Sequence, residues 1–248
     1  MQLYSAASKK GLYFGTAISF EPLQQDDMRH LVRQHVNSLT PENAMKWEVI
    51  HPEKGSFDWK QMDEIVSFAL EQSAQVRGHA ICWHSQNPLW LEGIQDAEML
   101  EETLQGHASR SIFTISACDV VIEPFLDNGA LRHNIWFNVL GEAYIEKAFK
   151  ICHRIAPHIK LYINEYNIEE ANAKSDALLA LVERLLHRGI PIHGIGFQCH
   201  LNASQYPRNI VENWKRFTDL GLEIAVTELD VRLPVDGNGG KKDLLVFQ

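Results

Sequence analysis

The sequence lacks any long apolar run. Nowhere in its 248 residues does an apolar stretch approach the roughly 20 residues that a membrane-spanning helix requires. The first residues, MQLYSAASKKG, contain none of the apolar core that defines a signal peptide. The sequence therefore predicts neither a membrane span nor an export signal, and as written it indicates an intracellular protein.

A surplus of positive charge is also missing. The chain has 23 Lys and Arg against 32 Asp and Glu, a formal net charge of -9. Such a surface does not attract nucleic acid or anionic lipid, so we expect neither as a partner. A neutral or cationic partner suits this charge better, and no block of like charges suggests a binding tail.

Cysteine is scarce and scattered. The four cysteines, Cys82, Cys118, Cys152 and Cys199, form no C-x-x-C pair, and three of them lie within apolar runs typical of buried strands. This pattern favours reduced cysteines in the core over a disulfide framework or a zinc site.

Glycine is absent from the first expected strand-to-helix turn, at residues 18–22. An open, doubly wound sheet usually binds a nucleotide through a glycine-rich turn at this point, so its absence argues against that fold. No phosphate-binding loop occurs elsewhere in the sequence.

Short strand-like runs alternate with longer helix-like runs along the whole chain. The expected strands are residues 12–19, 36–40, 75–83, 118–125, 160–167, 194–200 and 223–231. This alternation predicts parallel strands joined by crossover helices, and a TIM barrel contains eight such units in about 250 residues. We therefore predict one domain, residues 1–248, forming an incomplete (β/α)8 barrel with about seven of its eight units.

Local signals set the expected ends of several helices. Asp58 and Gln61 form a capping-box pattern ahead of a helix that includes residues 62–69. Gly189 is expected to end the helix around residues 178–185, while Pro207 opens and Gly221 closes a later one. A glycine-rich loop at 236–240 follows the seventh strand, so we expect the eighth strand and its helix to be missing and the first and seventh strands to remain unpaired with each other.

Polar residues gather at the carboxyl ends of the expected strands, which in a barrel line the active site. They are carboxylates, amides, imidazoles and an indole: Glu42, Asn43, Lys46, His79, Trp83, His84, Gln86, Glu123, Asn164, Glu165, Asn167, Gln198, His200, Glu228 and Asp230. Amides and carboxylates bind sugar hydroxyls, and aromatic faces bind the pyranose ring. The set favours a carbohydrate ligand.

Two of these carboxylates, Glu123 and Glu228, directly follow apolar strands that lie on roughly opposite sides of the expected barrel. Glycosidases require such a pair, in which one carboxyl has a raised pKa and donates a proton while the other stays ionised. A single Glu at a strand end is more often solvated or salt-bridged. The pair within a ring of sugar-type ligands favours catalysis.

Two simpler interpretations compete at these positions. His79, His84 and His200 could bind a metal, but residues five apart on a strand face opposite sides, and no zinc-binding motif is present. Trp47, Trp90 and Trp136 fit the commoner role of core aromatics, whereas Trp83 is expected to line the cleft. We predict no metal and no cofactor.

Several segments together resemble glycoside hydrolase family 10, which consists mainly of endo-1,4-β-xylanases. They are TPENAMKW at 40–47, RGH at 77–79, WHSQ at 83–86, LYINEYN at 161–167, GIGFQCHL at 194–201 and TELD at 227–230. The resemblance runs in the family's order from about Gly11 to Pro234. It implies a TIM barrel that hydrolyses β-1,4-xylan or xylo-oligosaccharides with retention of configuration, and family members are often secreted.

The resemblance also implies roles for individual residues. Glu228 would be the nucleophile, Glu123 the acid/base, and His200 a hydrogen-bond partner of the nucleophile. The substrate-binding residues would include Lys46 and His84 at the sugar just inside the cleavage point, Glu42 and Asn43 at the next sugar, and Gln86 along the cleft.

Three departures from the family pattern predict weak or absent activity. The family's strand-four motif, Trp-Asp-Val-Val-Asn-Glu-Ala, here reads CDVVIEP at 118–124. Ile122 replaces an Asn that binds the sugar 2-hydroxyl, and Pro124 removes a backbone donor. The segment 107–117 is short and divergent, and the eighth strand is absent from the expected elements. A non-catalytic carbohydrate-binding remnant and an unstable fragment therefore remain as alternatives.

Overall fold

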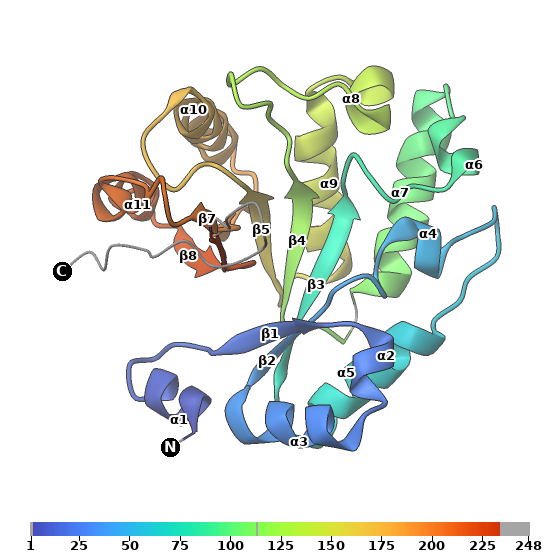
Figure 1. Cartoon of the computed structure of the whole chain (residues 1–248). Coiled ribbons are helices and arrows are strands. Elements are labelled where there is room, and N and C mark those ends of the chain that lie inside the picture. The colour runs from blue at the N-terminus through green and yellow to red at the C-terminus, as the bar shows by residue number, and fades with distance from the viewer. Residues whose placement is uncertain (1, 113, 234–248) are drawn as a thin grey trace, which may run out of the picture.

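Seven parallel strands form the main sheet of the computed structural model, which describes residues 2–112 and 114–233 (Figure 1). They are β1 (Gly15–Ile18), β2 (Ser38–Pro41), β3 (Gln75–Cys82), β4 (Ala117–Ile122), β5 (Lys160–Glu165), β6 (Gly194–Phe197) and β8 (Glu223–Val226). Each pairs with the next in chain order. This sequential order differs from that of a doubly wound sheet, whose order reverses at a switch point. The sheet is a curled, incomplete TIM barrel, as predicted.

Helices precede the first strand and occupy the connections between the strands (Figure 1). They are α1 (Leu3–Ser8), α2 (Phe20–Leu23), α3 (Asp26–His35), α4 (Trp47–Ile50), α5 (Lys60–Glu71), α6 (Leu89–Glu92), α7 (Ala97–Ser111), α8 (Ile135–Leu140), α9 (Ala143–Ile155), α10 (Ala173–His187) and α11 (Ile210–Thr218). The central strands β4, β5 and β6 are almost entirely buried beneath them. Near-continuous burial is the normal condition of parallel strands and explains their apolar sequences.

The sixth and seventh expected strands each break into two pieces, which corrects the sequence-based prediction. Residues 194–200 form β6 and the start of β7 (His200–Asn202), and residues 223–231 form β8 and the start of β9 (Asp230–Arg232). Cys199 lies at φ 59°, a left-handed conformation that no strand accommodates. Beyond the breaks, β7 and β9 pair in a separate two-stranded sheet.

The edges of the main sheet match the prediction that its first and last strands are not paired with each other. In the part of the chain that the structure describes, β1 pairs only with β2, and β8 pairs only with β6. The glycine-rich loop expected at 236–240 lies outside the described residues.

The expected helix ends are partly confirmed. Gly189 and Gly221 follow α10 and α11 with φ of 71° and 83°, the left-handed conformation that glycine adopts without steric cost. The predicted starts are wrong. Asp58 accepts a hydrogen bond from the Lys60 amide (3.0 Å), but no capping box with Gln61 forms and α5 begins at Lys60. Likewise α11 begins at Ile210, three residues after Pro207.

The core contains the four cysteines and two of the six tryptophans. All four cysteines are buried and unbonded, as predicted. Trp47 and Trp136 are buried, and the ring of His107 stacks on that of Trp47 with 3.7 Å between centroids. Within residues 2–112 and 114–233, neither ring nitrogen of His107 has a hydrogen-bond partner. Burial lowers the pKa of His107 to about 3, and the nearby His51 adds to this effect.

Because its folded-state pKa lies below the unfolded value of about 6.5, His107 should make stability depend on pH. The unfolded chain binds a proton that the folded chain excludes, so the free energy of unfolding should fall as pH drops from about 6.5 towards 3. The contribution is at most about 1.4 kcal/mol per pH unit. Urea unfolding across this range should show a shallower slope for His107→Leu, whereas the exposed-site control His30→Gln should keep the original slope. Equal slopes in all three proteins would contradict the assignment.

Candidate active site

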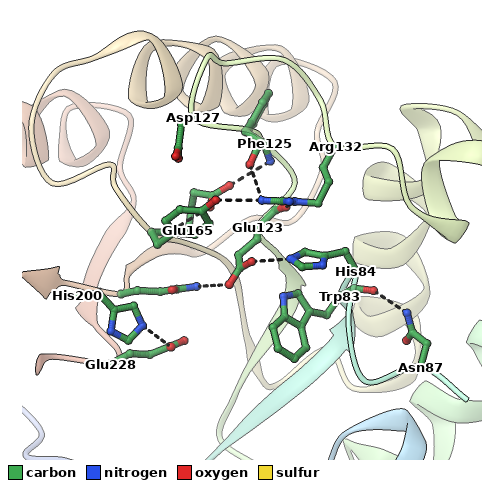
Figure 2. Close-up of polar contacts among 12 residues, drawn as sticks. Trp83, His84, Asn87, Glu123, Phe125, Asp127, Arg132, Glu165, His200 and Glu228 are labelled. Carbon is green, nitrogen blue, oxygen red and sulfur yellow. Dashed lines mark hydrogen bonds and ion pairs between the residues drawn. The ribbon is translucent and has the colours of Figure 1, made fainter.

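Glu123 lies at the carboxyl end of β4 and projects into a group of polar side chains (Figure 2). Its carboxylate is 2.8 Å from His84 Nε2, and it accepts a hydrogen bond from Gln198 Nε2 at 3.2 Å. His84 comes from the segment after β3 and Gln198 from the segment after β6. Residues far apart in the sequence therefore meet on one carboxylate.

Glu228, just after β8, has its own set of partners. Asn164 Nδ2 donates to one carboxylate oxygen at 2.8 Å, and His200 Nε2 lies 3.1 Å from the other. The opposite ring nitrogen of His200 is 2.7 Å from Asp230. Burial lowers the pKa of His200, but the two carboxylates together outweigh it and raise the pKa above its ordinary value.

Gly196 on β6 gives Asn164 the space to reach Glu228 from β5. A Cβ at this glycine would lie 2.5 Å from Asn164 Oδ1, closer than any real contact allows. The fully buried amide of Asn164 accepts a hydrogen bond from Thr227 at 2.7 Å while it donates to Glu228. Asn164 therefore orients Glu228 from within the sheet.

Gln198 contacts both Glu123 and Glu228. Its side chain donates to Glu123, and its backbone carbonyl accepts from the Glu228 amide at 3.0 Å. Figure 2 shows Glu123 and Glu228 with His84 on one and His200 on the other. The predicted meeting of the two glutamates in one site is thus present in the structure.

Lys46 is a buried cation beside these acids. Its Nζ lies 4.2 Å from the centroid of the Trp83 ring. Burial lowers the pKa of Lys46 to about 8, against the opposing effects of Glu228, Asp119, Glu123 and Glu42. Its charge therefore depends on the surrounding carboxylates.

The remaining predicted residues flank this centre. His79 Nδ1 is 2.9 Å from Asp119, a buried carboxylate that also pairs with Arg77. Gln86 Nε2 donates to Asn43 at 3.3 Å and to Glu48 at 2.9 Å. Glu42 accepts a hydrogen bond from Ser19.

Comparison with known proteins identifies the family. The model of "Glycosyl hydrolase family 10" matches residues 2–243. The chain belongs to glycosyl hydrolase family 10.

Among its relatives in this family is a beta-1,4-xylanase of Dictyoglomus thermophilum, 40% identical over 236 residues that cover 91% of this chain and 66% of the relative. Endo-1,4-beta-xylanase A of Phanerodontia chrysosporium is 37% identical over 240 residues, which cover 94% of this chain and 59% of the relative. The chain thus spans 59 to 66% of the length of these two relatives. Xylanase 10B of Thermotoga petrophila, solved with xylobiose, superposes with a TM-score of 0.91 at 36% identity and covers 96% of this chain and 75% of that one.

The resting electrostatics of this family 10 chain correct one expectation, that its proton donor has a raised pKa. Burial does raise the pKa of Glu123 and is the largest single effect, but hydrogen bonds from His84 and Gln198 outweigh it and lower the pKa to about 2. Donors directed at a carboxylate stabilise its ionised form. Sequence patterns could not predict this balance, because it depends on contacts to Glu123 from the ends of two other strands, β3 and β6.

Sequence reasoning also missed residues behind the site. Arg132 and Lys174 lie in stretches with no strand-end signal, and Glu169 lies four residues beyond β5. Only Glu165 was among the polar residues expected at strand ends. No group of three or more His, Cys, Asp or Glu side chains in residues 2–112 and 114–233 could hold a metal ion. None of the helices described has the length and apolar character to cross a bilayer.

The low pKa of Glu123 is testable without any activity. In the unliganded protein, the carboxyl 13C shift of Glu123 should titrate well below the ordinary glutamate pKa of 4.5. Replacing His84 with Phe removes the strongest stabilising donor and leaves burial in place, so the pKa should rise. The control His158→Gln, at an exposed site, should leave it unchanged. An unaltered titration in His84→Phe would show that His84 does not control this carboxyl.

Proposed function

We propose that this chain hydrolyses internal β-1,4-xylosidic bonds in xylan with retention of configuration, and that residues 1–248 act as one catalytic domain. The observation that carries the proposal is the pair of strand-end glutamates, each held by its own histidine and amide. Membership of family 10 and the xylanase names of its relatives support xylan as the substrate class.

In the first step, a Glu228 oxygen attacks the anomeric carbon as the bond to the leaving-group oxygen breaks. Glu123 gives its proton to that oxygen, and a covalent glycosyl–Glu228 ester forms. Asn164 and His200 each hold one oxygen of Glu228. These contacts hold the nucleophile in one orientation before attack.

In the second step, water attacks the anomeric carbon and Glu123 takes a proton from it. Glu228 then leaves as a carboxylate, and the sugar retains its original configuration. His84 and Gln198 stabilise ionised Glu123, the form needed at this stage. These two contacts therefore favour the role of Glu123 as the general base.

The acid role of Glu123 requires its pKa to rise when substrate binds. Burial already raises the pKa and is the largest effect on it, and hydrogen bonds from Gln198 and His84 oppose the rise. A sugar oxygen that accepts the hydrogen bond from the Gln198 amide would remove one of the hydrogen bonds to Glu123. The same sugar would exclude water and increase the burial of the Glu123 carboxyl. Both changes favour the protonated carboxyl.

The sugar-binding roles follow from position around this centre. Lys46 and Trp83, in contact with each other, present a cation and an indole beside the two glutamates, and we assign them with His79 to the sugar that is attacked. Glu42, Asn43 and Gln86 lie along the ends of β2 and β3 and suit the next sugar. The xylobiose complex of the Thermotoga petrophila neighbour supports binding of such oligosaccharides.

A second candidate function is carbohydrate binding without catalysis. Ile122, at the end of β4 beside Glu123, is buried and has no polar side-chain atom to offer a sugar hydroxyl. Pro124 on the other side of Glu123 lacks an amide hydrogen. The intact contacts of both glutamates favour the catalytic proposal.

Retention can be tested directly. Proton NMR of xylohexaose hydrolysis should show the β-anomer of the new reducing end first, followed by slow mutarotation to the α-anomer. A retaining mechanism requires two carboxyls about 5–5.5 Å apart, whereas inversion leaves room for a water between them. A first-formed α-anomer would refute the mechanism. A chain that binds the oligosaccharide but releases no product would support the binding-only alternative.

The replacement Ile122→Asn should restore a contact to the sugar 2-hydroxyl. Such contacts strengthen in the transition state and are worth several kcal/mol, and each 1.36 kcal/mol is a factor of about ten in rate. We expect kcat/KM on xylan to rise by about tenfold or more. Ile122→Val is the matched control, because it keeps an apolar side chain at the same site, and it should give no increase. Equal rates for Asn and Ile would show that this position does not limit activity.

A further inference from the structure

The backbone at Glu123 has a strained conformation that neighbouring residues must stabilise. Glu123 lies at φ 52°, in the left-handed region that residues other than glycine rarely adopt. Pro124 follows and has no amide hydrogen to bond with the surrounding structure. A turn of this kind persists only when its neighbours hold it.

Glu165, the last residue of β5, holds this turn from the side remote from the cleft. Its carboxylate is fully buried and accepts three hydrogen bonds. One oxygen accepts from the Phe125 amide at 3.1 Å, and the other accepts from the Tyr166 amide at 3.1 Å and from Lys174 Nζ at 2.9 Å. The Phe125 amide is the first backbone donor after Glu123, so Glu165 fixes the point where the turn leaves the site.

Arg132 holds the same turn through its carbonyl groups. Its guanidinium donates to the Glu123 carbonyl at 3.1 Å, to the Phe125 carbonyl at 3.3 Å and to the Tyr166 hydroxyl at 3.1 Å. In the view of Figure 2, Glu165 and Arg132 lie above Glu123, and Glu228 lies below it. The backbone of the turn is therefore held by one acceptor, Glu165, and one donor, Arg132.

Lys174 keeps Glu165 in its accepting form. Burial raises the pKa of Glu165 to about 7, and Lys174 opposes this rise more than any other group. Lys174 is itself buried. A buried ion pair is weak evidence for stability, since apolar residues of similar volume often serve as well. Stability alone therefore does not explain the Lys174–Glu165 ion pair.

The same segment provides a second buried carboxylate on its other side. Glu169 accepts a hydrogen bond from the Cys199 amide at 2.9 Å, and Cys199 lies at φ 59° between Gln198 and His200. The region after β5 thus holds one left-handed turn on each neighbouring strand end. One turn carries Glu123, and the other carries the partner of Glu228.

We propose that Glu165 is a positioning residue that holds the 123–125 turn so that the Glu123 carboxyl meets the leaving-group oxygen, while Glu169 does the same for His200 and hence for Glu228. The inference rests on the proposed function. A misplacement of about 1 Å at a reacting group can cost a hundredfold in rate. Because the two turns serve different groups, their loss should have different kinetic signatures.

The variant Glu165→Gln separates positioning from packing. Three donors surround the carboxylate, and a Gln side chain has one acceptor oxygen and an amide that is itself a donor, so at least one neighbour must move away. Glu169→Gln makes the same chemical change behind the other turn. Arg184→Met controls for loss of an arginine, because Arg184 is exposed and pairs only with Glu142 among the described residues.

The test compares kcat/KM, which reports the first bond-breaking step, for phenyl and 2,4-dinitrophenyl β-xylobiosides. Dinitrophenolate leaves without a proton, whereas phenol needs the acid. Glu165→Gln should lose tenfold or more on the phenyl substrate and less than twofold on the dinitrophenyl one. Glu169→Gln should lose kcat/KM equally on both substrates, since it impairs the attack by Glu228.

If Glu165→Gln does not fold, Arg132→Met should give the same leaving-group dependence, and Arg184→Met should match the wild type. Equal losses on both substrates for Glu165→Gln or Arg132→Met would overturn the proposal.

Failure of the proposed function would be seen separately, as a wild-type chain inactive on both substrates. Amide hydrogen exchange then decides the positioning role. In Glu165→Gln the Phe125 amide should exchange at least tenfold faster while the Cys199 amide is unchanged, and Glu169→Gln should show the reverse. An unchanged Phe125 amide in Glu165→Gln would overturn the role of Glu165 whatever the activity.

Discussion

The common direction of the seven strands in the main sheet is the constraint on which the site depends. Because every neighbour pair in this sheet is parallel, the carboxyl ends of β1 to β6 and β8 meet at one edge. Residues as distant in sequence as Glu123 and Gln198 come within hydrogen-bond distance there. Parallel strands have both faces buried and therefore have apolar sequences. The end of each apolar run also determines which polar residue stands at the carboxyl end of the strand.

Two sets of charged groups lie at that edge. The first set contains Glu123 and Glu228 with His84, His200 and Lys46. The pKa of each shifted group in it follows from competition between burial and its neighbours. Glu165 and Glu169 instead accept hydrogen bonds from the backbone amides of Phe125 and Cys199. These two carboxylates hold the backbone of the turns, and we propose that Glu123 and Glu228 carry out the chemistry.

The sequence was sufficient for the sheet order, the barrel class and the meeting of Glu123 with Glu228, because hydrophobic periodicity and strand ends depend on local composition. It was insufficient where long-range contacts decide. The left-handed turn at Cys199 breaks a strand that periodicity alone would continue, and it is held by Glu169 from another connection. The low pKa of Glu123 and the hydrogen bond from Arg132 to the Glu123 carbonyl likewise depend on partners that only the folded chain brings together.

The most direct test of the account is to trap the covalent intermediate on Glu228. A xylobioside with fluorine at C2 and dinitrophenolate as leaving group slows both steps by destabilising positive charge, but its good leaving group lets the first step proceed, so the glycosyl–enzyme ester accumulates. Mass spectrometry of the digested protein should then find one sugar on the peptide that contains Glu228, with the label absent from Glu228→Gln and present in Glu123→Gln. A label on Glu123, or turnover of a dinitrophenyl substrate without any trapped ester, would contradict the assignment of nucleophile and acid/base.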